Sequence, residues 1–357
     1  MWNGTEGKPI IRIQNLNDPL KEYNYTEREV KDTNIARKGD LLVSWSASLG
    51  VYEWNGQDAC INQHIFKVVP NNEKIDKTYL KRALELSIVE MESQVHGATM
   101  KHITRGKFLA NQIPLPPLAE QRRIASILDQ ADELRQKRQQ AIEKLDQLLQ
   151  ATFIEMFGDP VSNPKGWEKE TIGNLTTFIT SGSRGWAQYY ADSGSKFIRI
   201  QNLVKGDLDM SDCAYVNAPD SAEAKRTLVQ AGDVLVSITA DLGRTAVVPN
   251  DIGMAHINQH VAILRLTGVN PAFISHYLAS VGGKVQFEKL NRSAVKAGLN
   301  FNDIRSLEVL LPPQELQNKY VQIVHNIKNH QQQLIHFKKQ SDILFSSLQN
   351  QAFNGTL

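Results

Sequence analysis

The chain has 357 residues, of which 41% are hydrophobic and 22% are charged, enough for two packed domains of ordinary size. Its 40 Lys and Arg against 38 Asp and Glu leave a net charge of +2, so any contact with nucleic acid must come from local basic patches. No apolar run approaches the roughly 20 residues that cross a membrane, and the start, MWNGTEGKPI, has neither a basic leader nor an apolar signal core; we therefore expect a cytoplasmic protein with no membrane contact.

Residues 1–116 are predicted to form a globular domain rich in strands. IIRIQNL from Ile10, GDLLVSW from Gly39 and INQHIF from Ile61 are short apolar runs, and the Gly-Asp pair is a turn that leads into a strand. The most basic stretch of the segment is MKHITRGK, from Met100. The domain is therefore expected to be α+β or mainly β.

A long helix is predicted over residues 117–158. It follows a Pro-Pro pair, which the first turn of a helix tolerates, and FGDP from Phe157 closes it. Apolar residues recur at spacings of three and four, as in a coiled coil. The predicted seam is Ile124, Ile127, Ala131, Leu134, Ala141, Leu145 and Leu148, with Arg138 as a break.

The blocks of the first segment then recur in the same order. FIRIQNL from Phe197, GDVLVSI from Gly232 and INQHVA from Ile257 fall within residues 159–312, which we predict to be a second globular domain. Matches that keep their order along the chain indicate an internal duplication, and hence a pseudo-twofold repeat.

A second long helix is predicted over residues 313–357, after LLPPQELQ, as the first helix follows PLPPLAEQ. Each helix of about 40 residues would be about 60 Å long, more than the flank of a small domain can cover. We therefore predict that the two seams pack together as an antiparallel coiled coil; an ordinary core face is the alternative. The second seam is predicted at Tyr320, Ile323, Ile327, His330, Leu334, Phe337, Ser341, Leu344 and Leu348.

This order of domain, Pro-Pro helix, domain and Pro-Pro helix resembles the specificity subunit of type I restriction-modification enzymes. The resemblance rests on PLPPLAEQRRIASILDQAD, on the two GD-L-S-LG blocks, on ITSGSRGWAQYY and on FGDP, and it covers nearly the whole chain. It implies two target recognition domains, each reading one half of a bipartite double-stranded DNA target, with the paired helices as the spacer. It also implies two methyltransferase subunits held by the helices, restriction subunits added through them, and no catalysis in the chain itself.

The first unit departs from this pattern. Residues 166–196 precede the second FIRIQNL block, whereas only residues 1–9 precede the first. We therefore expect the first recognition domain to lack the opening strand and the glycine loop of the second. A shortened chain, a misplaced start codon or a gene split in nature would each produce such a start.

The main candidate for DNA contact is the loop TSGSRGW, from Thr180. Sequence readout needs directional donors and acceptors, and phosphate binding needs Lys, Arg or backbone amides. The loop offers Ser181, Ser183 and Arg184 beside glycines that permit a close backbone approach. The alternative is an ordinary turn held in place by Trp186.

Residues that both copies share suit tasks that both copies share. Arg12 and Arg199 are expected to touch phosphate or to brace the sheet, and bracing is favoured because identical residues cannot distinguish two half-sites. The Asn-Gln-His blocks at residues 62–64 and 258–260 are expected to form hydrogen bonds that maintain the fold.

Specificity is expected where the copies differ. Ser46 stands opposite Thr239, and the run Tyr52, Glu53 and Trp54 stands opposite Arg244 and Thr245. Basic residues expected along the DNA backbone, with a solvated surface as the alternative, are Lys101, His102 and Arg105 in the first domain and Arg292 and Lys296 in the second.

Motifs of an enzyme are missing from the sequence. It contains no Asn/Asp-Pro-Pro-aromatic motif of an adenine methyltransferase and no G-x-x-x-x-G-K-[ST] loop. Glu29-Val30-Lys31 with Asp18 imitates a metal nuclease site but has no copy in the second unit. No cofactor is expected. The remaining alternatives are a coiled-coil adaptor without DNA binding and a self-contained nuclease or methyltransferase.

Overall fold

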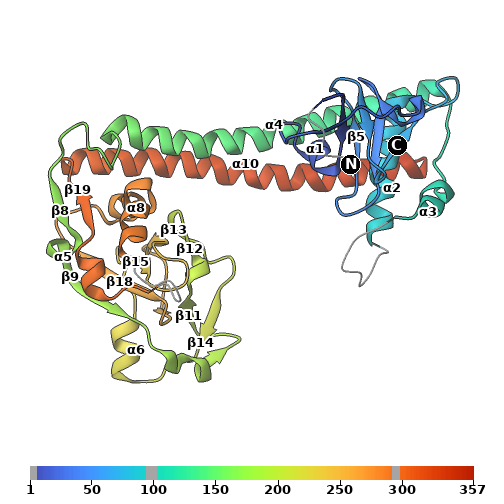
Figure 1. Cartoon of the computed structure of the whole chain (residues 1–357). Coiled ribbons are helices and arrows are strands. Elements are labelled where there is room, and N and C mark those ends of the chain that lie inside the picture. The colour runs from blue at the N-terminus through green and yellow to red at the C-terminus, as the bar shows by residue number, and fades with distance from the viewer. Residues whose placement is uncertain (1–5, 94–102, 292–297) are drawn as a thin grey trace. The chain divides into compact units, whose positions relative to one another are not determined.

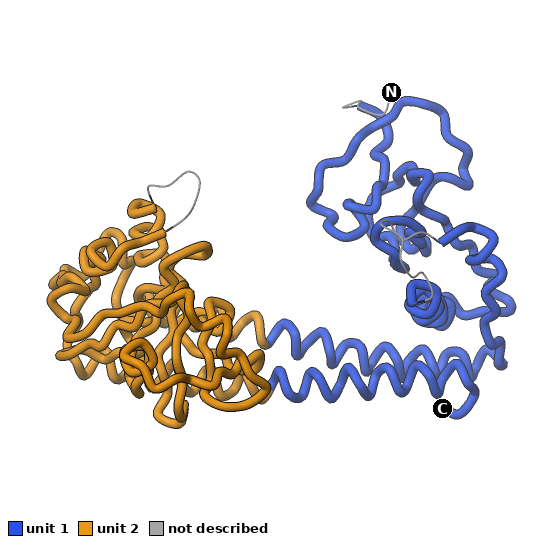
Figure 2. Tube along the Cα trace, turned by 90° about the horizontal axis from the view of Figure 1, so that it is seen from below, with its two compact units in different colours: residues 1–141, 334–357 blue, residues 142–333 orange. Residues whose placement is uncertain are grey.

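The computed structural model describes residues 6–93, 103–291 and 298–357. The chain divides into two compact units, coloured separately in Figure 2: unit 1 is residues 1–141 and 334–357, and unit 2 is residues 142–333. Each unit combines β-sheets and short helices with part of two long helices, so the expected α+β fold is confirmed (Figure 1). The assignment of residue ranges to recognition domains and spacer helices stays a prediction.

Unit 1 contains two sheets among its described residues, with strand orders β2-β1-β6-β3 and β5-β4-β7. Strand β4, the GDLLVSW block, is buried on both faces: Leu42 packs into a core with Ile11, whereas Leu41 and Val43 pack against α2. The elements are β1 (Lys8–Ile11), α1 (Ile13–Asn17), β2 (Asn24–Thr26), β3 (Ile35–Ala36), β4 (Leu41–Ser44), β5 (Gly50–Glu53), β6 (Ala59–Ile61), β7 (Ile65–Val68), α2 (Lys77–Ser93) and α3 (Arg105–Ala110).

Unit 2 repeats this plan with more strands. Its sheets have the orders β10-β14-β11-β17, β12-β13-β16-β15-β18-β9 and β19-β8 among the described residues. The strands are β8 (Lys169–Thr171), β9 (Thr176–Ser181), β10 (Tyr190–Ala191), β11 (Ser195–Ile198), β12 (Leu203–Val204), β13 (Gly206–Leu208), β14 (Ala214–Val216), β15 (Val234–Ser237), β16 (Thr245–Val247), β17 (Ala255–Ile257), β18 (Val261–Leu266) and β19 (Glu308–Leu310). The short helices are α5 (Ile172–Leu175), α6 (Ala222–Thr227), α7 (Pro271–Ala279), α8 (Val281–Leu290) and α9 (Phe301–Arg305).

The duplication extends to strand register. The IRIQNL strand pairs in parallel with the strand of the INQH block in both units, through Ile11 and Ile61 in one and Ile198 and Ile257 in the other. The same strand pairs antiparallel with β2 in unit 1 and with β14 in unit 2. The repeated sequence blocks therefore fold into equivalent strands.

The two copies differ at one sheet edge. Strand β18 lies between β15 and β9 in unit 2, whereas β7, its equivalent, has β4 as its one partner strand among the described residues of unit 1. Strand β9 belongs to the segment that has no counterpart in the first copy. Among the described residues, unit 1 has no strand at the position that β9 holds in unit 2, and the shortened start of the first recognition domain stays a prediction.

Both long helices begin directly after Pro-Pro, as the sequence predicted. They are α4 (Leu118–Phe157) and α10 (Gln314–Asn354). A buried glutamine holds each start in place: Gln121 accepts a hydrogen bond from the Asp76 amide at 2.8 Å, and Gln317 accepts one from the Asn270 amide at 2.9 Å. Asp76 and Asn270 in turn cap the N-termini of α2 and α7. The Pro-Pro-x-x-x-Gln block therefore ties each long helix to the short helix before it.

The two helices pair in antiparallel fashion within each unit. In unit 1, Arg135 of α4 donates to Asp342 of α10 at 2.7 Å, and the end of α10 packs Phe345 against Ile124 and Leu128. In unit 2, the rings of Phe153 and Tyr320 lie 5.7 Å apart. The start of one helix thus packs against the end of the other in both units, which confirms the predicted pairing.

Part of the predicted seam is wrong by one residue. Ile124, Tyr320 and Ile327 are buried as expected, but the helices also bury Leu128, Val324 and Phe345, which were not assigned to it. The predicted seam residues Leu134, Leu148, His330, Phe337 and Leu344 are exposed instead. The cause is that polar side chains occupy seam positions: Gln331 donates to Asp146, and Arg135 to Asp342, so the true seam is not uniformly apolar.

Among the described residues, no helix combines the length and the apolar character needed to cross a membrane. Cys60 and Cys213 are free thiols; Cys60 is buried, and Cys213 is half-buried.

Candidate nucleic-acid interface

The IRIQN block holds a loop together in both units. Asn202 is 1% exposed, and its side-chain amide donates to the carbonyls of Asp209 and Asp212 at 2.9 and 3.0 Å. Its Oδ1 accepts from the Arg199 amide at 2.8 Å, and Arg199 Nη2 lies 3.0 Å from the Asp212 carboxylate. The Arg199 side chain is therefore occupied by its own loop.

The first copy repeats these bonds. Buried Asn15 donates to the carbonyls of Lys21 and Glu22, at 3.0 and 3.3 Å, and Arg12 donates to the Glu22 carbonyl at 3.2 Å. The polar residues inside this apolar block thus satisfy backbone groups of the segment that follows it. The bracing role that we favoured for Arg12 and Arg199 agrees with these contacts.

Replacing Asn202 with alanine should cost about 2 kcal/mol of stability in unit 2, because it leaves the Asp209 carbonyl and the Arg199 amide without their side-chain partner and removes one of the two donors to the Asp212 carbonyl. Hydrogen exchange across residues 197–212 at increasing urea measures this cost. Gln201→Ala is the matched control, since Gln201 is exposed in the same block, and it should change exchange little. Equal effects of the two variants would contradict the bracing role.

The Asn-Gln-His blocks form hydrogen bonds in both units, as predicted. Asn62 Oδ1 accepts from the His64 amide at 3.1 Å, and Asn258 Oδ1 accepts from the His260 amide at 3.0 Å. Each histidine side chain also contacts one of the residues that differ between the two copies. Ser46 Oγ lies 3.1 Å from His64 Nδ1, and Thr239 Oγ1 lies 2.5 Å from His260 Nδ1.

The turn after each of these hydroxyls has the same unusual backbone. Ala47 has φ of 58° and Ala240 has φ of 60°, in the left-handed region that residues with a Cβ rarely adopt. Ser44 and Ser237 support the turn, because each hydroxyl donates at 2.5 Å to the carbonyl four residues later. Ser46 and Thr239 therefore sit in one shared frame and differ by a methyl group, which is the arrangement expected of positions that can vary without altering the fold.

The TSGSRGW loop follows β9 and is anchored by its tryptophan. Trp186 is 3% exposed, and its ring centroid lies 4.9 Å from that of His256 and 5.3 Å from that of Phe197. Ser183 caps the short 3-10 helix Arg184–Tyr189 by accepting from the Gly185 amide at 3.3 Å. Arg184 is exposed and makes no hydrogen bond or ion pair with the described residues, so its guanidinium is available to a ligand.

The sequence predicted that the glycines of this loop let its backbone approach a neighbour closely. In the structure that neighbour is another part of the same protein. A Cβ at Gly182 would lie 2.4 Å from the Ile257 carbonyl oxygen, so the glycine lets the end of β9 pack against the INQH block. Arg226 of α6 fixes the same end, donating to the Ser181 carbonyl at 2.6 Å and to Glu223 at 2.5 Å. Burial raises the pKa of the Glu223 carboxyl, but the bonds from Arg226 and Ser183 outweigh it and hold the pKa below its usual value.

Of the other candidates for DNA contact, the structure describes Arg244 and Arg105. Arg244 is held by Asp241, with Nε 2.5 Å from the carboxylate, and Arg105 is an exposed first residue of α3. Among the positions at which the copies were expected to differ, Trp54 is buried core, and Thr245 is buried and donates to the Ser275 carbonyl. Four candidates lie outside the described residues: Lys101, His102, Arg292 and Lys296.

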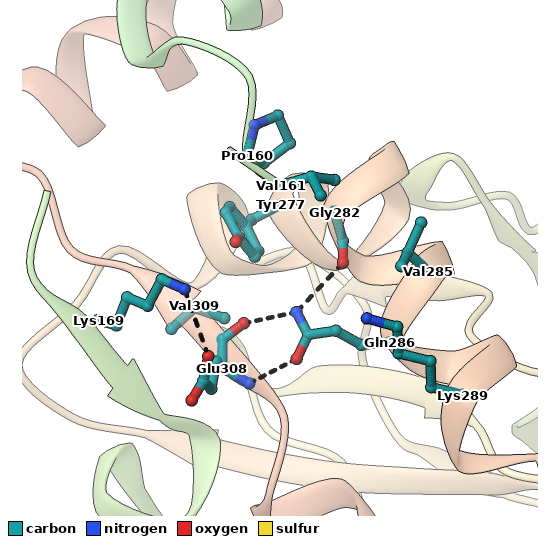
Figure 3. Close-up of a pocket in the computed structure, with 10 residues that line it drawn as sticks. All are labelled: Pro160, Val161, Lys169, Tyr277, Gly282, Val285, Gln286, Lys289, Glu308 and Val309. Atoms are coloured by element: carbon teal, nitrogen blue, oxygen red, sulfur yellow. Dashed lines mark hydrogen bonds and ion pairs between the residues drawn. The ribbon is translucent and has the colours of Figure 1, made fainter. Parts of the chain in front are cut away.

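A hollow in unit 2, drawn in Figure 3, lies between the turn after α4 and the elements β8, α7, α8 and β19. Four of its lining residues, Lys169, Gly282, Gln286 and Glu308, interact with one another. Gln286 donates to the carbonyls of Gly282 and Glu308 at 3.1 and 2.8 Å and accepts from the Glu308 amide, while Lys169 lies 3.6 Å from the Glu308 carboxylate. None of the predicted contact residues lines this hollow.

Comparison with known proteins gives one consistent result. The type I restriction enzyme EcoBI specificity subunit of Escherichia coli is 24% identical over 91% of this chain and 74% of its own length. The type I restriction-modification S subunit from M. genitalium shares 15% identity over 99% of this chain and 90% of its own, with a TM-score of 0.59. A chain from a structure on complex assembly and conformational transition of the type I R-M system shares 18% identity over 90% of this chain and 83% of its own, with a TM-score of 0.57.

These likenesses agree with the internal duplication. Residues 3–144 and 164–344 match the family described as the type I restriction modification DNA specificity domain, once for each copy of the repeat. The chain therefore belongs to the family of type I restriction modification DNA specificity proteins.

Proposed function

We propose that this chain is the sequence-specificity subunit of a type I restriction-modification enzyme. In this role it reads a bipartite double-stranded DNA target, one half-site with each recognition domain, and performs no chemistry itself. The observation that carries the proposal is the duplicated frame: both units keep the same strand register and the same braced loops. Residues such as Ser46 and Thr239 vary within that frame, as readers of two different half-sites must.

The proposed contacts fall into two classes. We propose that Ser46, Ser181, Ser183, Arg184 and Thr239 contact base edges and that the remaining basic residues hold phosphate. Within this set, Ser46 is 6% exposed and Ser181 is the last residue of β9. The full proposed set is Arg12, Ser46, Lys101, His102, Arg105, Ser181, Ser183, Arg184, Arg199, Thr239, Arg244, Arg292 and Lys296. Arg199 and Arg244 already form ion pairs with Asp212 and Asp241. On contacting DNA, each arginine would either keep its ion pair or exchange the carboxylate for a phosphate.

Arg184→Ala should weaken binding of the assembled enzyme to its cognate DNA by roughly 5- to 150-fold, since a bidentate arginine contact is worth about 1–3 kcal/mol. Arg305→Ala is the matched control, because it removes one exposed positive charge from the same unit. Binding is measured by titration at several salt concentrations. A base contact would lower affinity for cognate DNA alone, whereas a phosphate contact would lower affinity for all DNA and reduce the salt slope by about one. Unchanged binding would remove Arg184 from the interface.

We further propose that the paired helices hold two methyltransferase subunits, through which restriction subunits are added. Apolar side chains on the outer faces of α4 and α10 support this, because exposed leucine and phenylalanine on a helix favour protein contact. Leu134, Phe337 and Leu344 of unit 1 are 47%, 48% and 58% exposed, and Leu148 of unit 2 is 46% exposed. The complex would act on DNA in the cytoplasm.

The test of the function is to assemble the chain with methyltransferase subunits and map methylated adenine in a host genome at base resolution. A split target that depends on this chain supports the proposal. The chain alone, incubated with DNA, magnesium and S-adenosylmethionine, should neither cut nor mark it. If purified chain shows no salt-sensitive binding to duplex DNA in any assembly, the coiled-coil adaptor would be the better description.

A further inference from the structure

A histidine in unit 2 lies against the hydroxyl that differs between the two copies. The Ile238 amide donates to the His260 carbonyl at 2.9 Å, and the His260 amide donates to Asn258 Oδ1 at 3.0 Å, so the backbone of His260 is fixed beside β15. Its imidazole Nδ1 lies 2.5 Å from the hydroxyl oxygen of Thr239. The other ring nitrogen, Nε2, lies 2.9 Å from the side-chain nitrogen of Gln259. The imidazole therefore links Gln259 to Thr239.

The glutamine sets which ring nitrogen carries the proton of the neutral histidine. An amide nitrogen donates hydrogen bonds and does not accept them, so His260 Nε2 accepts from Gln259. The proton of the neutral ring then lies on Nδ1, which donates to Thr239 Oγ1. The hydroxyl proton of Thr239 stays available, because Oγ1 makes no other hydrogen bond with the described residues. With the ring proton on Nε2 instead, the hydroxyl would donate to Nδ1 and offer a ligand its lone pairs alone.

The first copy repeats this arrangement. Gln63 Nε2 lies 3.4 Å from His64 Nε2, and His64 Nδ1 lies 3.1 Å from Ser46 Oγ. The Trp45 amide donates to the His64 carbonyl at 3.3 Å, as the corresponding amide does in unit 2. In both units the amide nitrogen of the glutamine, rather than its oxygen, faces the ring. The polarity of the hydroxyl is therefore the same in both copies, although the hydroxyl residue differs.

Thr239 lies beside segments that we propose to contact DNA. It pairs with Gly298 in an isolated β-bridge, and Gly298 directly follows residues 292–297, which contain two of the proposed contacts. Asn258, of the same INQH block as the histidine, packs against the TSGSRGW loop, since a Cβ at Gly182 would lie 2.6 Å from the Asn258 carbonyl oxygen. A hydroxyl that donates at this place suits an acceptor on a base edge, such as purine N7 or thymine O4.

We propose that Gln259 and His260 are positioning residues that make Thr239 a hydrogen-bond donor to a base of the DNA target. The inference rests on the proposed DNA-reading role and adds to it the direction of one contact. His64 of unit 1 takes the same tautomer, set by Gln63. The repeated Gln-His pair then keeps the hydroxyl a donor whether the residue is serine or threonine.

The first test needs no DNA, so its failure is distinct from a failure of the proposed function. Long-range ¹H–¹⁵N correlation of the full chain, labelled with ¹⁵N-histidine and held above neutral pH, distinguishes protonated from unprotonated ring nitrogens. His260 and His64 should carry the proton on Nδ1. Gln259→Met keeps the length of the side chain without its amide, so it should lower the Nδ1–H fraction of His260 and leave His64 unchanged. A proton on Nε2 in the parent, or an unchanged tautomer in the variant, would overturn the proposal.

The second test measures binding of the assembled enzyme to cognate and to unrelated DNA. Thr239→Val removes the hydroxyl at nearly constant shape and should weaken cognate binding about fivefold, the effect of one neutral hydrogen bond. Thr239→Ser keeps the hydroxyl and should bind within about twofold of the parent. Gln259→Met should weaken cognate binding about twofold or more on its own, and should cause no further loss in the Thr239→Val background, because it acts through that hydroxyl.

Two outcomes of this cycle would contradict the proposal. An equal loss of affinity for unrelated DNA would place the Thr239 contact at phosphate, and additive losses would mean that Gln259 acts by another route. An assembled parent enzyme that binds no DNA would refute the proposed function and with it the base contact, and the tautomer measured without DNA separates that result from a wrong hydrogen-bond polarity.

Discussion

Replacing Arg82 with methionine should destabilise unit 1 by about 3 kcal/mol, the cost expected when one partner of a buried ion network is removed. Arg82 lies on α2 with its side chain 9% exposed. Its guanidinium donates to Asp129 at 2.8 Å, to Glu85 at 2.9 Å and to Asp132 at 3.1 Å. Methionine fills much of the same volume, so the loss reports the charge and its hydrogen bonds rather than a cavity.

The reason for the large effect is that Arg82 joins two elements of unit 1. Asp129 and Asp132 belong to α4, and Asp132 also pairs with Arg135, which reaches Asp342 of α10. Burial lowers the pKa of Arg82, but the surrounding carboxylates outweigh it and keep the pKa above its usual value, so Arg82 is charged at neutral pH. With Arg82 in place the Asp132 side chain is 17% exposed, and without it Arg135 is the cationic partner that Asp132 keeps among the described residues.

Arg123→Met is the matched control. Arg123 pairs with Glu120 on the same long helix, but these side chains are 47% and 38% exposed, so solvent screens the pair and the expected change in stability is small. Hydrogen exchange of α2 measures both, with α7 of unit 2 as the internal reference. A loss of 3 kcal/mol corresponds to roughly 150-fold faster exchange in α2. A change of less than about fivefold in the Arg82 variant, or equal changes in both variants, would contradict a buried network.

The contact between α7 and α10 in unit 2 is equivalent to the contact between α2 and α4 in unit 1. Its charged residues differ, which the duplication did not predict. Counting from the capping residues Asp76 and Asn270, Arg82 corresponds to His276, and the spacing of the two Pro-Pro blocks makes Lys328 the counterpart of Asp132. There Lys328 pairs with Asp207, and His276 Nε2 lies 3.4 Å from the same carboxylate. Burial lowers the pKa of His276 below its usual value, so this imidazole is neutral at neutral pH.

In unit 1 the positive charge at this contact is on the short helix, as Arg82 of α2, whereas in unit 2 it is on the long helix, as Lys328 of α10. Asp207, which has no place in the repeated blocks, supplies the negative partner. No pattern of spacing or composition identifies such an exchange, because each residue alone reads as an ordinary polar position on a helix or turn. Only the packing of α7 against α10 brings them together.

The fold was predictable where residues recur in order. The paired IRIQNL, GD and INQH blocks and the Pro-Pro pairs all became equivalent strands and helix starts, since each is a local signal repeated in the same context. The helix seam was predictable only in part, because Gln331 and Arg135 fill positions where apolar residues were counted. The loop anchors were missed for a similar reason: Arg226 and Glu223 fix the TSGSRGW loop from α6, far along the chain, and nothing near the loop signals them.

A paired deletion of seven residues from each long helix should shorten the spacer between the two half-sites by about three base pairs, if the helix pair sets their distance as the resemblance to specificity subunits implies. Removing residues 137–143 of α4 and 333–339 of α10 keeps the flanking pairs Arg135–Asp342 and Asp146–Gln331 in antiparallel register. Seven residues correspond to about 10 Å of helix, or about three steps of 3.4 Å along DNA, and to two turns of a coiled coil, so the seam face is retained.

Base-resolution mapping of methylated adenine in a host that carries the assembled variant measures the spacer. Deleting residues 137–143 alone is the control, because it shifts the register of one helix against the other and should lose the pairing, seen as rapid hydrogen exchange in both helices. The paired variant should keep slow exchange and its subunits. A folded and assembled paired variant that still methylates the parent target, with the parent spacing, would show that something other than the helix pair fixes the distance between half-sites.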